Sequence, residues 1–136
     1  MADPQSVADW LRLAAMHERM ARLGCDDRLA AQQGQWHTGM GVEAALKAYI
    51  MHVRRLNRWP DPPSPLRTHD LRILVREAGI VLNSQHPVGP AWHVMLQYDR
   101  SQGYDPKPMP RRVARSYLEA AFGPSGVVTW LRTLLP

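Results

Sequence analysis

The sequence predicts an all-α fold, an antiparallel helical bundle with short additional helices. Apolar residues recur at the three- and four-residue spacing of helices in several segments, and no stretch alternates with the period of two that strands show. Pro and Gly residues separate these segments, as they do at helix ends and in connections. The length of 136 residues suits one domain with a hydrophobic core, so we expect residues 1–136 to form a single domain.

Two long helices are expected first. Ser6 is a favourable cap for the first helix, and Gly24 is a favourable residue at which to end it. Asp26 or Asp27 should cap the second helix, whose apolar stripe continues to about Asn57. These two segments are the longest helices that the pattern predicts.

Two glycines, Gly39 and Gly41, interrupt the second predicted helix. Each lowers the helix propensity of its position by about 1 kcal/mol relative to Ala. Glycines at such places often allow another helix to approach, so we expect a tight crossing or a bend there.

Shorter helices should follow an extended Pro-rich connection over residues 59–65, where neither a helix nor a central strand can form. Thr68 is the expected cap of the third helix, whose apolar residues continue to Ile80. Loops are expected at 84–90 and 101–110. The remaining helices are then expected over residues 91–99, 110–122 and 125–135.

The composition excludes several classes of protein. No apolar run approaches the length of a membrane span, and the N-terminus lacks the basic start and apolar core of a signal peptide, so we expect a cytoplasmic protein. The single Cys25 agrees with a reducing compartment and excludes a cysteine-rich zinc site within one chain. The six histidines form no close ligand pair on one helix. We therefore expect neither a metal nor a cofactor.

The chain is basic, with a net charge of +5 and an isoelectric point near 10. Basic surface favours phosphate-rich partners such as RNA or nucleotides. Arginines also outnumber lysines strongly, so a compositional bias is an equally good explanation of the charge. A cluster of cations near the start of the fifth predicted helix, where the helix dipole disfavours them, suggests binding of RNA or an acidic partner. Its members are Arg111, Arg112 and Arg115.

Two polar groups border the apolar stripe of the second predicted helix. Glu43 and Lys47 are spaced i, i+4 in the orientation that favours an ion pair. The preferred interpretation is a partly buried pair that fixes the register of the helix. The alternative is a polar pocket that binds a nucleotide or a partner.

The run from Thr68 to Leu71 places polar residues at the start of the third predicted helix. Asp70 is favoured there by the helix dipole, and we assign it a structural role together with the cap. In the alternative hypothesis, His69 joins Arg67 and Arg72 in a phosphate-binding site.

Several motifs, in their order and spacing, resemble the HEPN domain family (higher eukaryotes and prokaryotes nucleotide-binding). The segment from Trp36 to Ala48, which contains the Glu-x-x-x-Lys-Ala pattern, is similar to the central helix of that family, and Thr68-His69-Asp70-Leu71 is the most specific match. The opening and closing portions also resemble it; they are Trp10 to Ala14, Gly103 to Pro106 and Val128 to Leu131. The resemblance implies a HEPN-like bundle over the whole chain and a homodimer.

Many members of that family are metal-independent ribonucleases with an Arg followed by His after four to six residues, late in the domain. The only such spacing here is Arg12 to His17, on the first predicted helix, and no histidine follows His93. The resemblance therefore implies a catalytically degenerate module that binds nucleotide, RNA or a nucleotidyltransferase-like protein in a toxin–antitoxin or defence system.

Two other functions stay open. The first is an endoribonuclease whose site lies outside the usual position of the family motif, with His93, Arg100 and Tyr104 as its candidate residues. In such chemistry, His acts as acid or base and Arg stabilises charge on the phosphate. The second is a purely structural dimeric scaffold.

Overall fold

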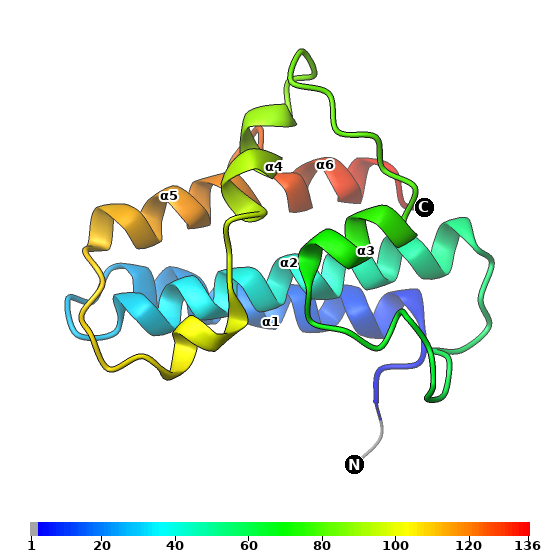
Figure 1. The fold of residues 1–136 in the computed structure, drawn as a ribbon, viewed down its shortest axis with the longest axis horizontal. Helices are drawn as coiled ribbons and strands as arrows, with labels where there is room; N and C mark the ends of the chain where they lie inside the picture. The colour runs from blue at the N-terminus through cyan, green and yellow to red at the C-terminus, as the bar shows by residue number, and fades with distance from the viewer. Residues whose placement is uncertain (1–2) are drawn as a thin grey trace.

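The computed structural model describes residues 3–136, and within that range it is all-helical, with no β-strand. Helices α1 (Val7–Cys25) and α2 (Ala31–Val53) form a long antiparallel hairpin. Figure 1 shows α5 (Arg111–Phe122) and α6 (Val127–Thr133) on one side of it, following each other along α2. The short α3 (Leu71–Glu77), α4 (Gly89–Met95) and 3-10 helix η1 (Arg100–Tyr104) complete the arrangement. The predicted all-α bundle is confirmed.

Helix α1 begins at the predicted cap, but the turn between α1 and α2 differs from the prediction. The Oγ of Ser6 accepts a hydrogen bond from the backbone N–H of Asp9 at 3.0 Å, which caps α1. The predictions for the turn were wrong: α1 continues through Gly24 to Cys25, and the cap position of α2 is Ala30, without a side-chain bond. The carboxylate of Asp27 instead accepts from the N–H of Leu29 within the turn, at 2.8 Å.

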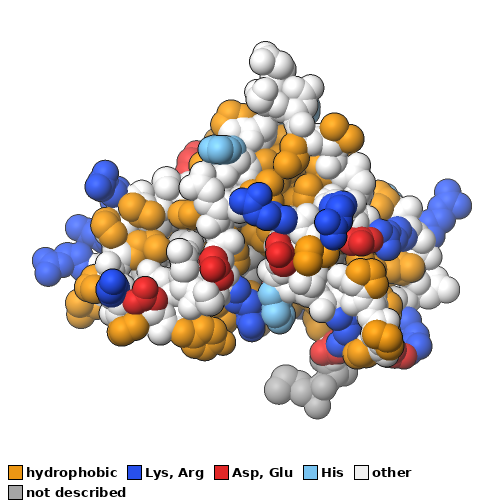
Figure 2. Space-filling view, viewed as in Figure 1, with side chains coloured by type: hydrophobic (Ala, Val, Ile, Leu, Met, Phe, Trp, Pro, Cys, Tyr) orange, Lys and Arg blue, Asp and Glu red, His pale blue; other side chains and the backbone are white. Residues whose placement is uncertain are grey.

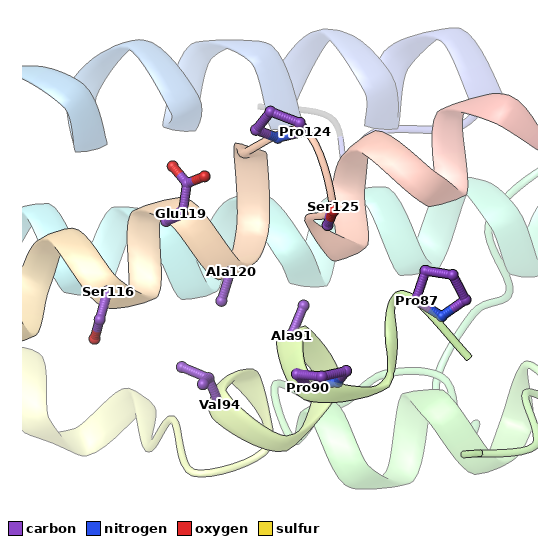
Figure 3. A pocket seen from close by; sticks show the side chains of 9 residues that line it. All are labelled: Pro87, Pro90, Ala91, Val94, Ser116, Glu119, Ala120, Pro124 and Ser125. Carbon is purple, nitrogen blue, oxygen red and sulfur yellow. The ribbon is translucent and has the colours of Figure 1, made fainter. Parts of the chain in front are cut away.

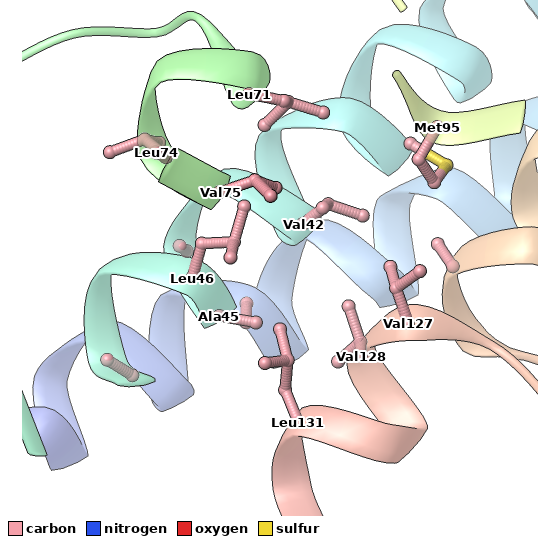
Figure 4. Packing of buried hydrophobic residues seen from close by; sticks show 14 of the residues in the cluster. Val42, Ala45, Leu46, Leu71, Leu74, Val75, Met95, Val127, Val128 and Leu131 are labelled. Carbon is pink, nitrogen blue, oxygen red and sulfur yellow. The ribbon is translucent and has the colours of Figure 1, made fainter. Parts of the chain in front are cut away.

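Helix α2 lies at the centre of the packing. Its Val42, Ala45 and Leu46 are fully buried and meet side chains from three other helices (Figure 4). These are Leu71, Leu74 and Val75 of α3, Met95 of α4, and Val127, Val128 and Leu131 of α6. A helix enclosed on so many sides must also satisfy any polar group on its buried faces.

The third helix has a different cap from the predicted one, and it ends near Gly79, before Ile80. Its cap is Asp70, whose carboxylate accepts from the N–H of Arg72 at 2.9 Å, whereas the hydroxyl of Thr68 accepts from the N–H of Asp70 at 3.1 Å, one step earlier. The expectation that Thr68 caps the helix was therefore wrong. Gly79 has a φ of +71°, which ends the helix and leaves Ile80 outside it.

The remaining bounds differ from the expectation for local reasons. The predicted end of the second helix at Asn57 was wrong, because Arg55 adopts a φ of +54° and the helix ends at Val53. The fourth helix ends at Met95 instead of 99, and the carboxylate of Asp99 accepts from the N–H of Ser101 at 2.9 Å to start η1 inside the expected loop. Among the described residues, no helix has the length and apolar character needed to cross a membrane.

Candidate functional site

A buried ion pair lies on α2 between the first helix and the Pro-rich connection. The Nζ of Lys47 is 3.0 Å from the Oε2 of Glu43, and both side chains are only 5% exposed. The ammonium group also lies 5.0 Å from the ring centroid of Trp10 and 5.5 Å from that of Trp59. The aromatic rings and the carboxylate together compensate a cation that would be costly to bury alone. The pair expected from the i, i+4 spacing is present.

The ion pair has a third member from a distant part of the chain. The Nδ1 of His69 lies 3.0 Å from the Oε1 of Glu43 and 3.1 Å from its Oε2. An ionised carboxylate only accepts hydrogen bonds, so Nδ1 of His69 carries the proton and donates it. The other ring nitrogen has no partner within residues 3–136, and the side chain is 50% exposed. Glu43 therefore fixes the orientation of an imidazole that faces outward.

His69 lines a polar cleft of about 550 Å³, which we call the arginine cleft. The cleft lies between the start of α3 and the chain that runs from α4 to η1, where cationic, acidic and histidine side chains gather in Figure 2. Its lining residues are Thr68, His69, Asp70, Arg72, Leu96, Gln97, Tyr98, Asp99 and Arg100.

The charged groups of the arginine cleft are not equally available to a ligand. The carboxylates of Asp70 and Asp99 cap α3 and η1 through backbone N–H groups. Neither Arg72 nor Arg100 forms an ion pair with any described residue, and the Nε of Arg100 is buried without a hydrogen-bond partner. Buried polar groups without a partner are rare, so this guanidinium is a candidate contact for a ligand.

The position of Arg100 depends on how its segment docks on α2. The hydroxyl of Tyr98 donates to the carbonyl of Trp36 at 3.3 Å, and burial, followed by the nearby charge of Glu43, raises the pKa of this phenol. A Cβ built on Gly39 would lie 2.1 Å from the Tyr98 ring, so only glycine allows this close contact. The expected close approach at Gly39 is thus made by a tyrosine ring.

A second cleft, of about 420 Å³, adjoins the first. We call it the tryptophan cleft, because the rings of Trp10 and Trp59 and the Glu43–Lys47 pair lie in its wall. The full lining is Asp3, Pro4, Trp10, Leu13, Met40, Glu43, Lys47, Trp59, Arg67, Thr68 and His69. Both clefts are lined by Thr68 and His69, so they meet at these two residues.

The phosphate site expected from the sequence is only partly assembled. His69 and Arg72 line the arginine cleft, but Arg67 does not. Its guanidinium pairs with Asp3 at 3.0 Å and donates to the carbonyl of Pro60 at 2.9 Å, at the rim of the tryptophan cleft. Arg100, which sequence analysis placed with a different set, takes the position opposite α3.

The basic cluster of α5 faces the end of α1 and lines neither cleft. Arg115 donates to the Oδ1 of Asp26 through Nε and a terminal nitrogen, at 3.1 and 2.9 Å, and Arg111 donates to the carbonyl of Asp26 at 3.3 Å. Arg112 is exposed. Two of the three predicted binding residues therefore attach α5 to the end of α1.

The catalytic candidates from the sequence are not brought into one cleft. His93 lines a third cleft of about 510 Å³, next to Arg72, whereas Arg100 lines the arginine cleft. Tyr104 is 74% exposed and lines none of these three clefts. The turn that begins at Asp99 separates Tyr104 from Arg100. The histidine that shares a cleft with Arg100 is His69 instead.

A histidine pair across the hairpin was not predicted from the sequence. The Nδ1 atoms of His17 on α1 and His37 on α2 lie 2.9 Å apart. Burial lowers the pKa of both imidazoles, and for His17 the charge of His37 lowers the pKa further. The two residues are 20 positions apart, so the pairing becomes visible only once the hairpin register is known.

A further groove, of about 360 Å³, lies between α4 and α5 (Figure 3). Small apolar side chains such as Ala91, Val94 and Ala120 face it, and Glu119 is its one charged lining residue. It therefore lacks the histidine and cationic side chains that line the other clefts described above. In the described part of the chain, no three His, Cys, Asp or Glu side chains gather to hold a metal ion.

Comparison with known proteins adds nothing to this description, because no family model, curated protein or solved structure matches the chain.

Proposed function

We propose that this chain is a catalytically degenerate HEPN-type helical module that binds a phosphate-bearing ligand, a nucleotide or RNA, in the arginine cleft. One observation carries the proposal. Arg72 and Arg100 line the same cleft without an ion-pair partner among the described residues, and the Nε of Arg100 is buried and unpaired. Arginine presents its donors in a planar fork that matches phosphate oxygens.

The neighbouring groups support an anionic ligand. The imidazole of His69, held through Nδ1 by Glu43, offers its second nitrogen to the cleft as a donor when it is protonated. The two carboxylates that line the cleft already accept backbone N–H groups. Neither carboxylate forms an ion pair with Arg72 or Arg100 in the described part of the chain. The two guanidinium groups therefore keep their N–H donors for a ligand.

The same cleft argues against catalysis. Cleavage of RNA by general acid–base chemistry requires groups that take and give protons near neutral pH. Among the lining residues of the arginine cleft, His69 is the one whose ordinary pKa lies in that range. Burial raises the pKa of Tyr98, so its phenol stays protonated and bound to a backbone carbonyl.

Equilibrium binding tests the proposal. Titration calorimetry with AMP and with a short single-stranded RNA should give affinities that fall by about tenfold or more in Arg72→Gln and Arg100→Gln, since hydrogen bonds to charged groups contribute about 1.5–3 kcal/mol. Arg112→Gln is the matched control, because that side chain is exposed and lines neither cleft. A ligand affinity that falls only in the control variant would contradict the proposal.

The alternative function is an endoribonuclease, and the carboxylate-oriented His69 beside Arg100 is the observation that favours it. Incubation of the purified protein with total RNA distinguishes the two. RNA that stays intact supports the degenerate module. Cleavage that disappears in His69→Ala but persists in His93→Ala would support the enzyme and place its site in this cleft.

The partner part of the proposal rests on the sequence resemblance: a homodimer and, in a toxin–antitoxin or defence system, a nucleotidyltransferase-like protein. An exposed apolar stripe on α1 supports the dimer, formed by Met16, Met20 and Leu23 at 60, 49 and 65% exposure. Light scattering should give twice the monomer mass, and Met20→Lys should give a monomer. A dimer that binds no phosphate ligand would favour the structural scaffold.

A further inference from the structure

The two clefts that meet at His69 have different chemistry. The arginine cleft is lined mostly by polar and charged residues. The tryptophan cleft combines apolar surface from Leu13, Met40 and Pro4 with two indole rings and the carboxylate of Glu43. Thr68 and His69 belong to both walls, so the two clefts share a boundary at these residues.

A buried donor in the wall of the tryptophan cleft has no partner. The side chain of Trp10 is 6% exposed, and its Nε1 makes no hydrogen bond with residues 3–136. A tryptophan N–H usually finds an acceptor when it is buried. A ligand ring that carries an acceptor would supply one at this wall, and Met40 offers apolar surface in the same cleft.

We propose that the two clefts are subsites for one nucleotide, with its base in the tryptophan cleft and its phosphate in the arginine cleft. This inference rests on the proposed function and adds the position of the base. The sugar would then lie beside Thr68 and His69, which join the subsites. Trp10 Nε1 would donate to a ring nitrogen or carbonyl of the base, and the Glu43 carboxylate can accept from an exocyclic amino group.

Entry of a base requires little rearrangement. Asp3 and Arg67 both line the tryptophan cleft and form an ion pair with each other, and their side chains are 56 and 28% exposed. Exposed ion pairs contribute little to stability, so this contact can open without a large cost. The volume of the cleft also lies within the range of small-molecule pockets.

The test compares ligands that carry a base with one that does not. Calorimetry is run with the ribonucleoside 5′-monophosphates and with ribose 5-phosphate, on the full chain and on two single variants, Met40→Ala and Leu29→Ala. At least one monophosphate should bind about tenfold tighter than ribose 5-phosphate, and Met40→Ala should remove most of that advantage, as expected for lost apolar contact in a pocket. Leu29→Ala, at a 92% exposed position in the turn between α1 and α2, should leave it unchanged.

A second measurement does not depend on any variant. Because Trp10 and Trp59 lie in the wall of the base subsite, that monophosphate should change the tryptophan emission more than ribose 5-phosphate does at equal occupancy. Arg100→Gln should weaken both kinds of ligand equally.

The outcomes separate the two proposals. If ribose 5-phosphate binds as tightly as every monophosphate, or if Met40→Ala weakens both kinds equally, the base subsite is wrong while the phosphate site stands. If none of these ligands binds, or if Arg100→Gln leaves their affinities unchanged, the proposed function is wrong and the base subsite falls with it.

Discussion

The Nδ1 of His69 lies 3.0 Å from the Oε1 of Glu43, a residue 26 positions earlier in the chain. This contact connects the buried ion pair of α2 to the cleft in front of α3. The carboxylate thus accepts hydrogen bonds from two cations or potential cations at once, Lys47 inside and His69 at the surface. Glu43 therefore both pairs with a buried cation and orients a residue that lines the cleft.

Removing one partner of the buried pair should be far more costly than replacing both. Lys47→Met leaves Glu43 without its buried cation, and Glu43→Leu leaves the ammonium without its anion, so each single change should lower the free energy of unfolding by about 3–5 kcal/mol. The double variant, with apolar side chains of similar volume, should lie within about 1 kcal/mol of the original chain or above it. Urea denaturation followed by circular dichroism measures all three.

The expectation depends on the pair being enclosed. The exposed ion pair of Arg58 with Asp61 is the matched control, and removing either side chain there should change stability by less than about 1 kcal/mol. Single losses in the Glu43–Lys47 pair as small as those in the control would mean that water reaches the ammonium group.

The His17–His37 pair predicts a stability that falls in mild acid. Burial, and the neighbouring imidazole in the case of His17, lower the pKa of these groups in the folded chain below the ordinary value of 6.5. The unfolded chain therefore binds more protons between that value and the lowered one, so the stability is fully present above pH 6.5 and is lost as the pH falls toward the lowered pKa. Thermal melts between pH 8 and pH 5 should show this decline.

A double substitution removes the effect if its origin is correct. His17→Gln combined with His37→Gln should flatten the pH dependence in that window, whereas His52→Gln, at an exposed position on the same helix, should leave it intact. An unchanged slope in the double variant would assign the acid sensitivity to other groups.

The effect of Gly39→Ala on the free energy of unfolding should change sign when the ring of Tyr98 is removed. Gly39→Ala should destabilise the fold by about 1–3 kcal/mol, because its Cβ would lie 2.1 Å from the ring of Tyr98. The shifted ring should also displace Arg100 and weaken phosphate binding. In a Tyr98→Ala background the clash is absent, and the same Gly39→Ala change should stabilise α2 by up to about 1 kcal/mol through helix propensity. Chemical denaturation of the four chains gives both values.

The arginines of α5 that contact Asp26 should contribute a little to stability and should not affect ligand binding. Arg115→Ala removes the pair with Asp26, whose side chains are 51 and 74% exposed, and should lower stability by about 0.2–1 kcal/mol. Binding of ribonucleoside monophosphates, measured by calorimetry, should stay within twofold of the original chain. An affinity loss as large as that of Arg100→Gln would move the proposed site to α5.

The segments with strong local signals were predictable. Apolar periodicity identified the helical segments and the all-α class, Ser6 identified the start of α1, and the i, i+4 spacing identified the Glu43–Lys47 pair. These features depend on residues within about one or two helical turns of each other. The start of α3 was predicted wrongly because Thr68 and Asp70, two residues apart, both have side chains that accept a backbone N–H, and only Asp70 caps the helix.

The site depended on contacts between distant segments. Arg72 and Arg100 were assigned from the sequence to two different sets, and only the docking of Tyr98 on α2 places both at one cleft. Gly39 indicated a close approach without identifying the ring that makes it.

The sequence by itself determined that this chain is helical and which faces of its helices are apolar. It also determined that Glu43 and Lys47 are spaced to form an ion pair on α2. The tertiary structure decided that His69 completes this pair and that two arginines without an ion-pair partner among residues 3–136 face the same cleft. The reason is physical: periodicity and capping arise from neighbouring residues, whereas a cleft is formed by side chains that share no local pattern and meet only after the helices pack.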